Sequence, residues 1–180
     1  MPEKAERNYL TPQVLAFIGR ESKEVAWPEP LDLSSLRRYI QASHDQNPLY
    51  HDEDFAKNSR YGALIAPPFY LARGFPGTLG EPPVDYAEIP EAHDDPEDDE
   101  NSTRVTIPGT GLPMNGGTEI EWFRPVYVGD TLYSKNKVRD IQQKTGRSGI
   151  FIVVTMERTV KNQRGEIVAI STQTSLRIPR

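Results

Sequence analysis

Near its C-terminus the chain carries the stretch GIFIVVTMERTVKNQRGEIVAISTQTSLRI, residues 149–178. Residues 149–161 and 166–178 are rich in β-branched residues, and the NQRG between them is typical of a turn. The first run alternates two apolar sets, Ile150, Ile152 and Val154 against Phe151, Val153 and Thr155, and the second places Val168, Ile170, Thr172 and Thr174 on one side. Since successive side chains of a strand point to opposite faces, each run predicts a strand with one buried face.

The rest of the chain has fewer strand signals and more helix signals. Residues 118–123 and 131–141 are two further β-type runs, and 22–28 predicts a short strand closed by the prolines of WPEP. A short helix is expected from Pro12, capped by Thr11 and ended by Gly19, and a second at 33–43 behind Asp32. Helices early and antiparallel strands late predict an α+β domain.

An apolar segment, FYLARGF, follows Ala66-Pro67-Pro68 and predicts a helix, because proline is well tolerated in a first helical turn. The segment is too apolar for a surface helix. The simplest arrangement that buries it is a curved antiparallel sheet wrapped around a central apolar helix.

Residues 76–116 are rich in Pro, Gly and acids and show no usable period, apart from a short strand expected at 104–107. Residues 81–100 hold ten acids and no Lys or Arg, so removing them from the net charge of −5 leaves +5 on the rest. A slightly basic body suits the phosphates of coenzyme A or an acidic carrier protein, but an ordinary mixed surface is the simpler explanation. We therefore expect a single domain over 1–180 with a long acidic insertion at about 76–116.

Composition excludes several classes of function. The chain has no cysteine, which excludes a thiol nucleophile and a disulfide framework and suits the cytoplasm, and its three histidines leave little material for a metal site. No run approaches the roughly 18 apolar residues of a membrane span, and the N-terminus lacks a signal peptide's apolar stretch. No basic stripe with interleaved aromatics indicates nucleic-acid binding. We expect no metal, no cofactor and no membrane.

The helix at 33–43 should stop before His44, because the residue before Pro48 avoids helical geometry. The loop that follows reads DQNPLYHD from Asp45 to Asp52. It resembles the signature D-x-N-P-L-H-x-D-x-x-x-A of R-specific enoyl-CoA hydratases in the MaoC-like family, whose fold is the hot-dog fold. The resemblance implies that an Asp and a His hold the water that adds to an enoyl thioester, while a backbone N–H stabilises the enolate.

Two departures from that signature matter. Tyr50 stands where the family has its histidine, and a phenol with an ordinary pKa near 10 is a poor base at neutral pH. His51 is one residue away, but neighbouring side chains of an extended segment face opposite ways. Pro67 and Pro68 align with the His-Gly pair that opens the family's helix, and proline has no N–H to donate.

The same departures are typical of the N-terminal dehydratase domain of this superfamily, which residues 116–132, GGTEIEWFRPVYVGDTL, also resemble. The resemblance covers roughly 10–178. It implies a subunit of a 2-enoyl-CoA hydratase or 3-hydroxyacyl-CoA dehydratase, a lyase of fatty acid or lipid metabolism acting on a coenzyme A or carrier-protein thioester. A second hot-dog subunit would supply the full Asp–His pair, and this chain would line the acyl pocket through Asn47, Tyr50, Pro67, Pro68 and Phe69.

Two alternatives remain. The chain could be a homodimeric hydratase with Asp45 and His51 as its catalytic pair, or a thioesterase using Asp45 alone. It could also be a non-catalytic binding or scaffold module. Each marked residue has an ordinary structural explanation too, since Asp45 and Asn47 favour turns and Tyr50 could simply pack in the core.

Overall fold

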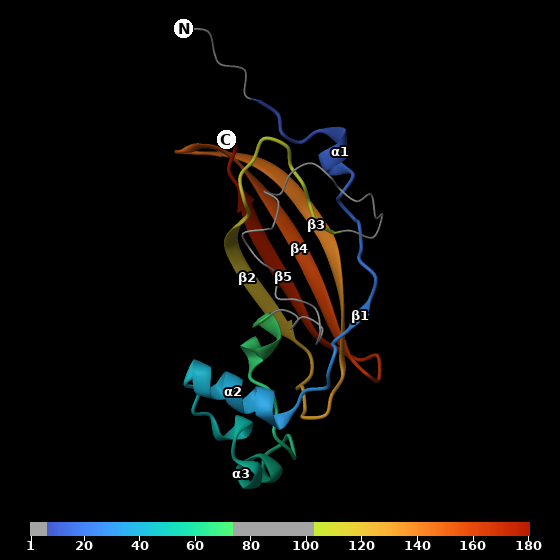
Figure 1. Ribbon diagram of the computed structural model, residues 1–180, viewed down its shortest axis with the longest axis vertical. Coiled ribbons are helices and arrows are strands. Elements are labelled where there is room, and N and C mark those ends of the chain that lie inside the picture. The colour runs from blue at the N-terminus through green and yellow to red at the C-terminus, as the bar shows by residue number, and fades with distance from the viewer. Residues whose placement is uncertain (1–6, 74–102) are drawn as a thin grey trace.

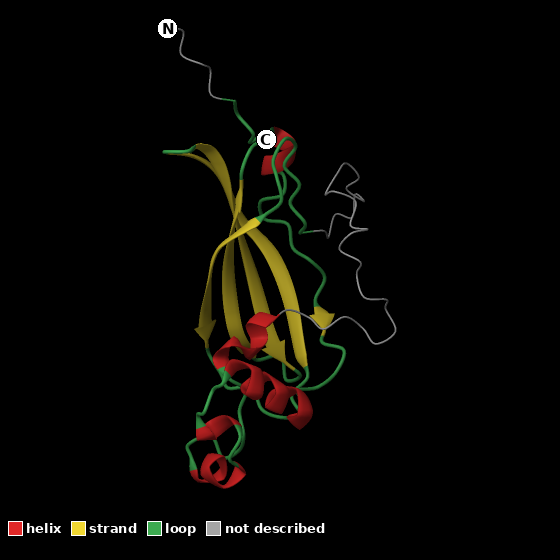
Figure 2. Cartoon of the chain, turned by 60° about the vertical axis from the view of Figure 1, so that its left-hand side comes forward, coloured by secondary structure: helices red, strands yellow, loops and turns green. Residues whose placement is uncertain are grey.

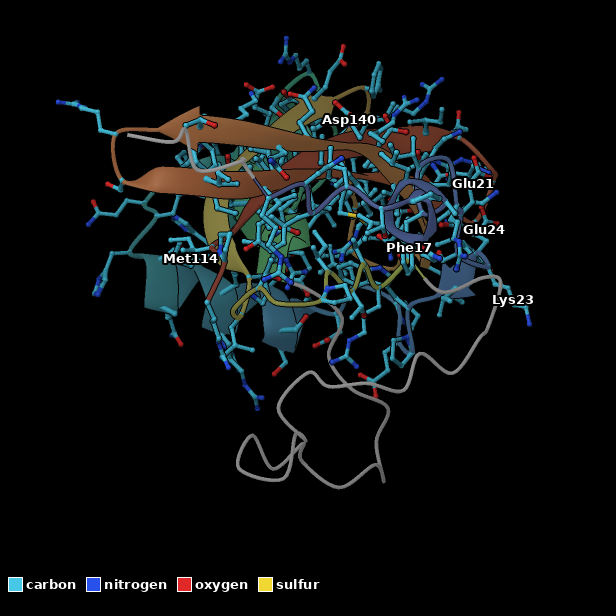
Figure 3. The ribbon with its side chains drawn as sticks, turned by 90° about the horizontal axis from the view of Figure 1, so that it is seen from above. Phe17, Glu21, Lys23, Glu24, Met114 and Asp140 are labelled. Atoms are coloured by element: carbon cyan, nitrogen blue, oxygen red, sulfur yellow. The ribbon has the colours of Figure 1, made fainter. Side chains whose placement is uncertain are left out.

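The computed structural model describes residues 7–73 and 103–180. Its framework is a five-stranded antiparallel sheet with the order β1-β3-β4-β5-β2. β1 (Val25–Ala26) and β2 (Met114–Trp122) form the edges. In Figure 1 the strands run side by side in that order, and viewed from above Met114 lies on the opposite side of the molecule from Glu21 and Glu24 (Figure 3).

The long strands confirm the predictions made from the last third of the chain. β3 (Leu132–Gly146), β4 (Gly149–Asn162) and β5 (Ile167–Arg177) pair along most of their lengths. β3 extends five residues past its predicted end at Ile141, because its last residue, Gly146, still pairs with Gly149 of β4. The NQRG turn is confirmed at Gly165, whose φ of +76° favours glycine.

β4 shows which face of the sheet is buried. Its even-numbered residues Ile152, Val154 and Val160 are buried, whereas Phe151 and Val153 are only half-buried. We call the side that carries these even-numbered residues the inner face. On β5 the inner residues are Ala169, Ser171 and Gln173, so Ile170, Thr172 and Thr174 belong to the outer face.

Two apolar clusters cover different parts of the inner face. The first gathers Val160 and Ala169 with side chains from α2 (Leu33–Ser43) and the segments that follow it. The second gathers Val138, Ile152 and Val154 with residues of the N-terminal segment and of 105–107. Between them the sheet carries polar residues, and this gap positions the cavity described below.

Helices other than α1 gather at one end of the sheet (Figure 2). α2 begins behind Asp32, whose Oδ1 accepts hydrogen bonds from the N–H groups of Ser34 and Ser35, and it ends at Ser43, as predicted. α3 (Glu53–Asn58) was not predicted. The N-terminal helix α1 (Pro12–Leu15) has the predicted Thr11 cap but ends four residues before Gly19.

Two predicted strands and one predicted helix differ from the structure. Only Val25–Ala26 of 22–28 forms a strand, and 104–107 forms none, although Val105 and Ile107 are buried in the second cluster. β2 starts at Met114, so the long loop ends before residue 116. The segment after Ala66 begins as a 3₁₀-helix, η2 (Pro68–Arg73), rather than an α-helix.

The rest of the predicted central helix lies outside the described residues, as do His93 and most of the acidic insertion at 76–116. The antiparallel sheet with its early helices confirms the α+β prediction.

Candidate functional site

Successive hydrogen bonds from backbone N–H groups to side-chain oxygens fold the loop that follows α2. His44 ends the helix with a φ of +54°, in the left-handed region, which turns the chain away from the helix axis. Asp45 Oδ1 accepts a hydrogen bond from the Asn47 N–H at 3.1 Å, and Asn47 Oδ1 accepts one from the Leu49 N–H at 3.1 Å. These two bonds fold the loop into η1 (Pro48–Tyr50) and give Asp45 and Asn47 structural roles.

The end of the loop is fixed in the same way. Asp52 caps α3 through a hydrogen bond from the Phe55 N–H to Oδ1 at 2.9 Å. The Ile65 N–H donates to the Leu49 carbonyl at 3.3 Å, and the Ala66 N–H donates to the Val126 carbonyl at 2.8 Å. The loop therefore lies between α2 and the segment that leads into η2.

Tyr50 lies buried at the centre of this loop, with 8% of its surface exposed. Burial raises the pKa of the phenol, the charge of Asp45 raises it further, and a hydrogen bond with Asn47 partly offsets both. At neutral pH the Tyr50 hydroxyl is therefore protonated. It offers a hydrogen-bond donor beside Asp45 and Asn47, but not a base.

Neither histidine near the loop is paired with Asp45 in the described part of the chain. His51 is exposed, and its Nε2 lies 3.3 Å from the Gln46 carbonyl oxygen. His44 is exposed at the end of α2. The structure brings Asp45, Asn47 and Tyr50 together and leaves His51 outside that group.

The start of η2 holds the three other residues that we expected in the pocket. Pro67 is buried, Pro68 is exposed, and Phe69 is 62% exposed. The Tyr70 N–H donates to the Pro67 carbonyl at 3.0 Å, and the Tyr70 hydroxyl lies 2.7 Å from Ser35 Oγ, which joins η2 to α2. Positions 67 and 68 have no N–H, so neither donates to an oxyanion.

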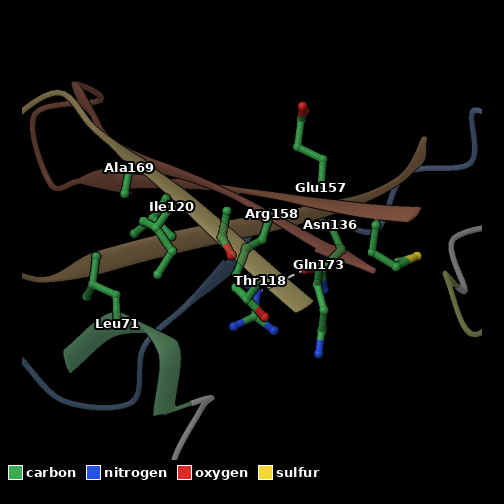
Figure 4. A pocket seen from close by; sticks show the side chains of 11 residues that line it. Leu71, Thr118, Ile120, Asn136, Glu157, Arg158, Ala169 and Gln173 are labelled. Atoms are coloured by element: carbon green, nitrogen blue, oxygen red, sulfur yellow. Dashed lines mark hydrogen bonds between the residues drawn. The ribbon is translucent and has the colours of Figure 1, made fainter. Parts of the chain in front are cut away.

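A cavity of about 360 Å³ opens on the inner face of the sheet, beside η2 (Figure 4). Leu71, Ile120, Val160 and Ala169 form its apolar wall. All four belong to the first apolar cluster or pack against it, and that cluster also contains Tyr50. Its volume is near the lower limit of the roughly 300–1,000 Å³ usual for ligand cavities.

The cavity also contains residues that the sequence analysis missed. Arg158 lies on the inner face of β4, and its Nε donates a hydrogen bond to Asn136 Oδ1 at 3.1 Å. Burial lowers the pKa of this guanidinium, which still stays charged because arginine keeps its proton in proteins. The signal was present in the sequence, because Arg158 shares the parity of Ile152 and Val154 and so interrupts the apolar positions between Ile150 and Val160.

Other kinds of site have no geometric support in the described ranges. Within 7–73 and 103–180, no three His, Cys, Asp or Glu residues lie close enough to hold a metal ion. No helix in those ranges is long and apolar enough to cross a membrane.

Comparisons with known proteins show the family and the fold of this chain. The family model described as "FAS1-like, dehydratase domain region" matches residues 16–171. A UPF0336 protein of Parafrankia sp. is 28% identical over 157 residues, which are 85% of this chain and 86% of that protein. A probable enoyl-CoA hydratase alpha subunit of Thermomonospora curvata is 26% identical over 86% of this chain, but the match spans only 47% of that longer protein.

Among solved structures, a chain of the ChsH1–ChsH2 complex from Mycobacterium tuberculosis superposes with a TM-score of 0.71. The two chains are 18% identical, and the match covers 93% of this chain and 89% of that one. At this identity the likeness concerns the fold alone. A MaoC-like dehydratase from Rhodospirillum rubrum, 23% identical, also superposes with a TM-score of 0.54 over 91% of this chain and 93% of that one, and this likeness confirms the predicted hot-dog fold.

Proposed function

This chain belongs to the family of the FAS1-like dehydratase domain region, and on that premise we propose that it is one subunit of an acyl-thioester hydratase or dehydratase. The reaction adds water to a 2-enoyl thioester or removes it from a 3-hydroxyacyl thioester. In our proposal the chain shapes the acyl pocket, and a second hot-dog subunit supplies the complete Asp–His pair.

The environment of Tyr50 is the main observation that supports assigning the chemistry to the partner subunit. Hydration needs a base that takes a proton from water while the oxygen attacks the β-carbon, and a donor that stabilises the resulting enolate. Tyr50 occupies the position of the family's histidine, and its buried phenol stays protonated. Among the described residues, His51 is turned to the Gln46 carbonyl and the prolines at 67 and 68 have no N–H, so neither a histidine base nor a backbone N–H from the start of η2 faces Asp45.

The cavity supports the binding half of the proposal. Its apolar wall of Leu71, Ile120, Val160 and Ala169 suits the methylene groups of an acyl chain. It adjoins the cluster that contains Tyr50, so an acyl group in the cavity would have its thioester end near the loop of Asp45. We infer that Asn47, Tyr50 and the start of η2 shape the entrance to this cavity.

The comparisons support a partner. One relative is named as an alpha subunit of an enoyl-CoA hydratase, and the structural neighbour comes from a complex of two proteins. We propose that this chain likewise functions as a hetero-oligomer in the cytoplasm. Its substrate would be an acyl thioester of coenzyme A or of a carrier protein, and the reaction would need no metal or organic cofactor.

The test is the hydration rate of a trans-2-enoyl-CoA, measured with the purified chain alone and after co-expression with a second hot-dog subunit that carries the complete Asp–His pair. We expect no rate above buffer for the chain alone and a clear rate for the pair. Tyr50→Phe in the pair should retain that rate, because the phenol is not the base. If the chain alone hydrates the substrate as fast as the pair does, the proposed division of roles is wrong.

A further inference from the structure

The first residues of β2 read Met-Asn-Gly-Gly, residues 114–117, at one edge of the sheet (Figure 1). Asn115 and the two glycines that follow it are exposed. The register with β5 passes from the pair Asn115–Ser175 directly to the pair Gly117–Thr174. Gly116 is therefore the extra residue of a β-bulge, where the ladder is locally interrupted.

The bulge favours glycine at both positions that follow Asn115. A Cβ on Gly116 would lie 3.1 Å from Thr174 Cγ2 and 3.2 Å from the Thr174 carbonyl oxygen, which is closer than ordinary packing allows. Gly117 has a φ of +136°, in the region that favours glycine. Because residue 116 has no side chain, nothing on it shields its peptide nitrogen from a neighbouring electrophile.

The side chain of Asn115 is tied back to this stretch of backbone. Asn115 Oδ1 accepts a hydrogen bond from the Gly117 N–H at 3.0 Å. The ring that this bond closes contains both Asn115 Cγ and the Gly116 peptide nitrogen, so the two atoms stay close together. The bond also draws electron density from the amide carbonyl, which makes Cγ a better electrophile. Two groups held together in this way react more readily than the same groups free in solution.

We propose that Asn115 is a site of spontaneous deamidation in the folded protein. Hydroxide removes the proton of the Gly116 peptide nitrogen, and this nitrogen attacks Asn115 Cγ. The new N–Cγ bond closes a succinimide ring, and the Cγ–Nδ2 bond breaks with release of ammonia, whose third proton comes from water. Water then opens the ring. Cleavage of the N–Cγ bond gives aspartate, and cleavage between the same nitrogen and the main-chain carbonyl carbon gives isoaspartate.

The two products change β2 differently. Aspartate leaves its main chain unchanged, whereas in isoaspartate the chain runs through Cβ and Cγ of residue 115 and gains an extra backbone atom. That atom does not fit the pairs Met114–Leu176 and Asn115–Ser175, so the isoaspartate form should lose this end of the ladder with β5. Thr118, which lines the cavity, follows the bulge, so the disruption begins beside the cavity wall. The inference does not depend on the proposed function, because the reaction needs only these residues and water.

The test incubates the purified full chain in mildly alkaline buffer and follows its asparagine-containing peptides by liquid chromatography and mass spectrometry. Asn115 should be lost first, at a rate proportional to the hydroxide concentration, while ammonia, aspartate and isoaspartate appear. The Asn115→Asp variant supplies the reference for the aspartate product. Asn115→Gln should stay unmodified over the same period, because its longer side chain has to close a larger ring.

Two other asparagines are internal controls in the same sample. Asn58 is exposed like Asn115, but the residue that follows it, Ser59, carries a side chain. Asn47 is followed by Pro48, whose nitrogen has no hydrogen to lose and so does not become the nucleophile. Both controls should remain asparagine while Asn115 is lost. The wild-type measurement needs no variant, so it holds whether or not a substituted chain folds.

The same chain unfolded in urea shows whether the fold permits the reaction. If the unfolded chain loses Asn115 and the folded chain keeps it, the strand protects the site, and the inference is wrong. Loss of Asn58 at the same rate as Asn115 would also overturn it, because the bulge would then contribute nothing. Aspartate without isoaspartate would indicate direct hydrolysis of the amide by water and would contradict the ring closure.

Discussion

The hydrogen bond between Ser35 Oγ and the Tyr70 hydroxyl, 2.7 Å long, joins α2 to η2 and so holds the candidate loop against the cavity wall. The Ser35 hydroxyl also donates a hydrogen bond to the Asp32 carbonyl at 3.1 Å, at the start of α2. Tyr70 is buried, with its ring edge-on to Tyr39 at 5.3 Å and stacked with Trp27 at 6.5 Å.

We expect the two side chains to be energetically coupled. A neutral hydrogen bond of this kind contributes about 0.5–1.5 kcal/mol to the free energy of unfolding. Ser35→Ala and Tyr70→Phe should each lower that free energy by about 1 kcal/mol, and the double variant should lose about 1 kcal/mol less than the sum. For a chain of this size, 1 kcal/mol corresponds to roughly 2–4 °C in melting temperature.

The assay is urea unfolding followed by circular dichroism for the wild type, the single variants and the double variant. Ser34→Ala combined with Tyr70→Phe is the control cycle, because Ser34 contributes only its backbone N–H to the Asp32 cap. That control should be additive within about 0.5 kcal/mol. If Ser35→Ala and Tyr70→Phe are additive to the same degree, the bond does not hold α2 to η2.

Three further perturbations test the fold around the site. Asp32→Ala should cost about 1 kcal/mol of stability through loss of the helix cap. The backbone hydrogen bond from Ser35 lowers the pKa of Asp32, so the ionised carboxylate stabilises the fold at any pH above 3.8, the ordinary pKa of an Asp. The difference in free energy of unfolding between wild type and Asp32→Ala should therefore shrink as the pH falls below 3.8. Glu21 lies 2.5 Å from Lys135 and 2.9 Å from Lys137, and these two lysines lower the pKa of Glu21 to about 2. The wild type should therefore melt at a higher temperature than Glu21→Gln at neutral pH, and this difference should be lost as the pH falls from 4.5 to 2. High salt should also reduce the difference, because it screens the ion pairs. Gly129→Ala should cost about 1 kcal/mol in urea unfolding, because Gly129 has a φ of +93°; an unchanged midpoint would contradict that strain.

The parts of the fold that depend on local signals could be predicted. Asp32 and Pro48 delimit α2 and its loop, and the alternation around Ile152 and Val154 predicted that β4 is a strand with one buried face, whereas the structure shows which face that is. The three-residue spacing between Asp32 and Ser35 is enough to place the cap. These features need only residues that are close in sequence.

Features that depend on partners distant in sequence could not be predicted. Val168 is the extra residue of a bulge where β5 pairs with β4, so both Val168 and Ala169 are buried, and alternation alone misplaces the inner face of β5. β1 shrinks to Val25–Ala26 because, within the predicted strand 22–28, the ladder with β3 pairs only these two residues. Register is decided by the partner strand, which the local sequence does not specify.

The candidate site shows a similar division. The motif located the loop of Asp45, but the same residue types serve chemistry and turns, and here Asp45 and Asn47 do fold the loop. Arg158 carried a signal that was overlooked, namely a charge within a run of apolar positions on β4. Its alignment with Asn136 follows only from the pairing of β3 with β4.

The most direct measurement of the central claim is the hydration rate of the two-subunit complex when this chain carries Asp45→Asn. Asparagine keeps the oxygen that accepts the Asn47 hydrogen bond and removes only the charge, and Asp52→Asn is a matched control because Asn caps α3 as well as Asp does. If this chain shapes the pocket and its partner does the chemistry, both variants should retain the wild-type rate within about threefold, whereas removing a general base would cost about 100-fold or more. A loss of that size for Asp45→Asn, with Asp52→Asn unaffected, would contradict the claim and assign the chemistry to this chain.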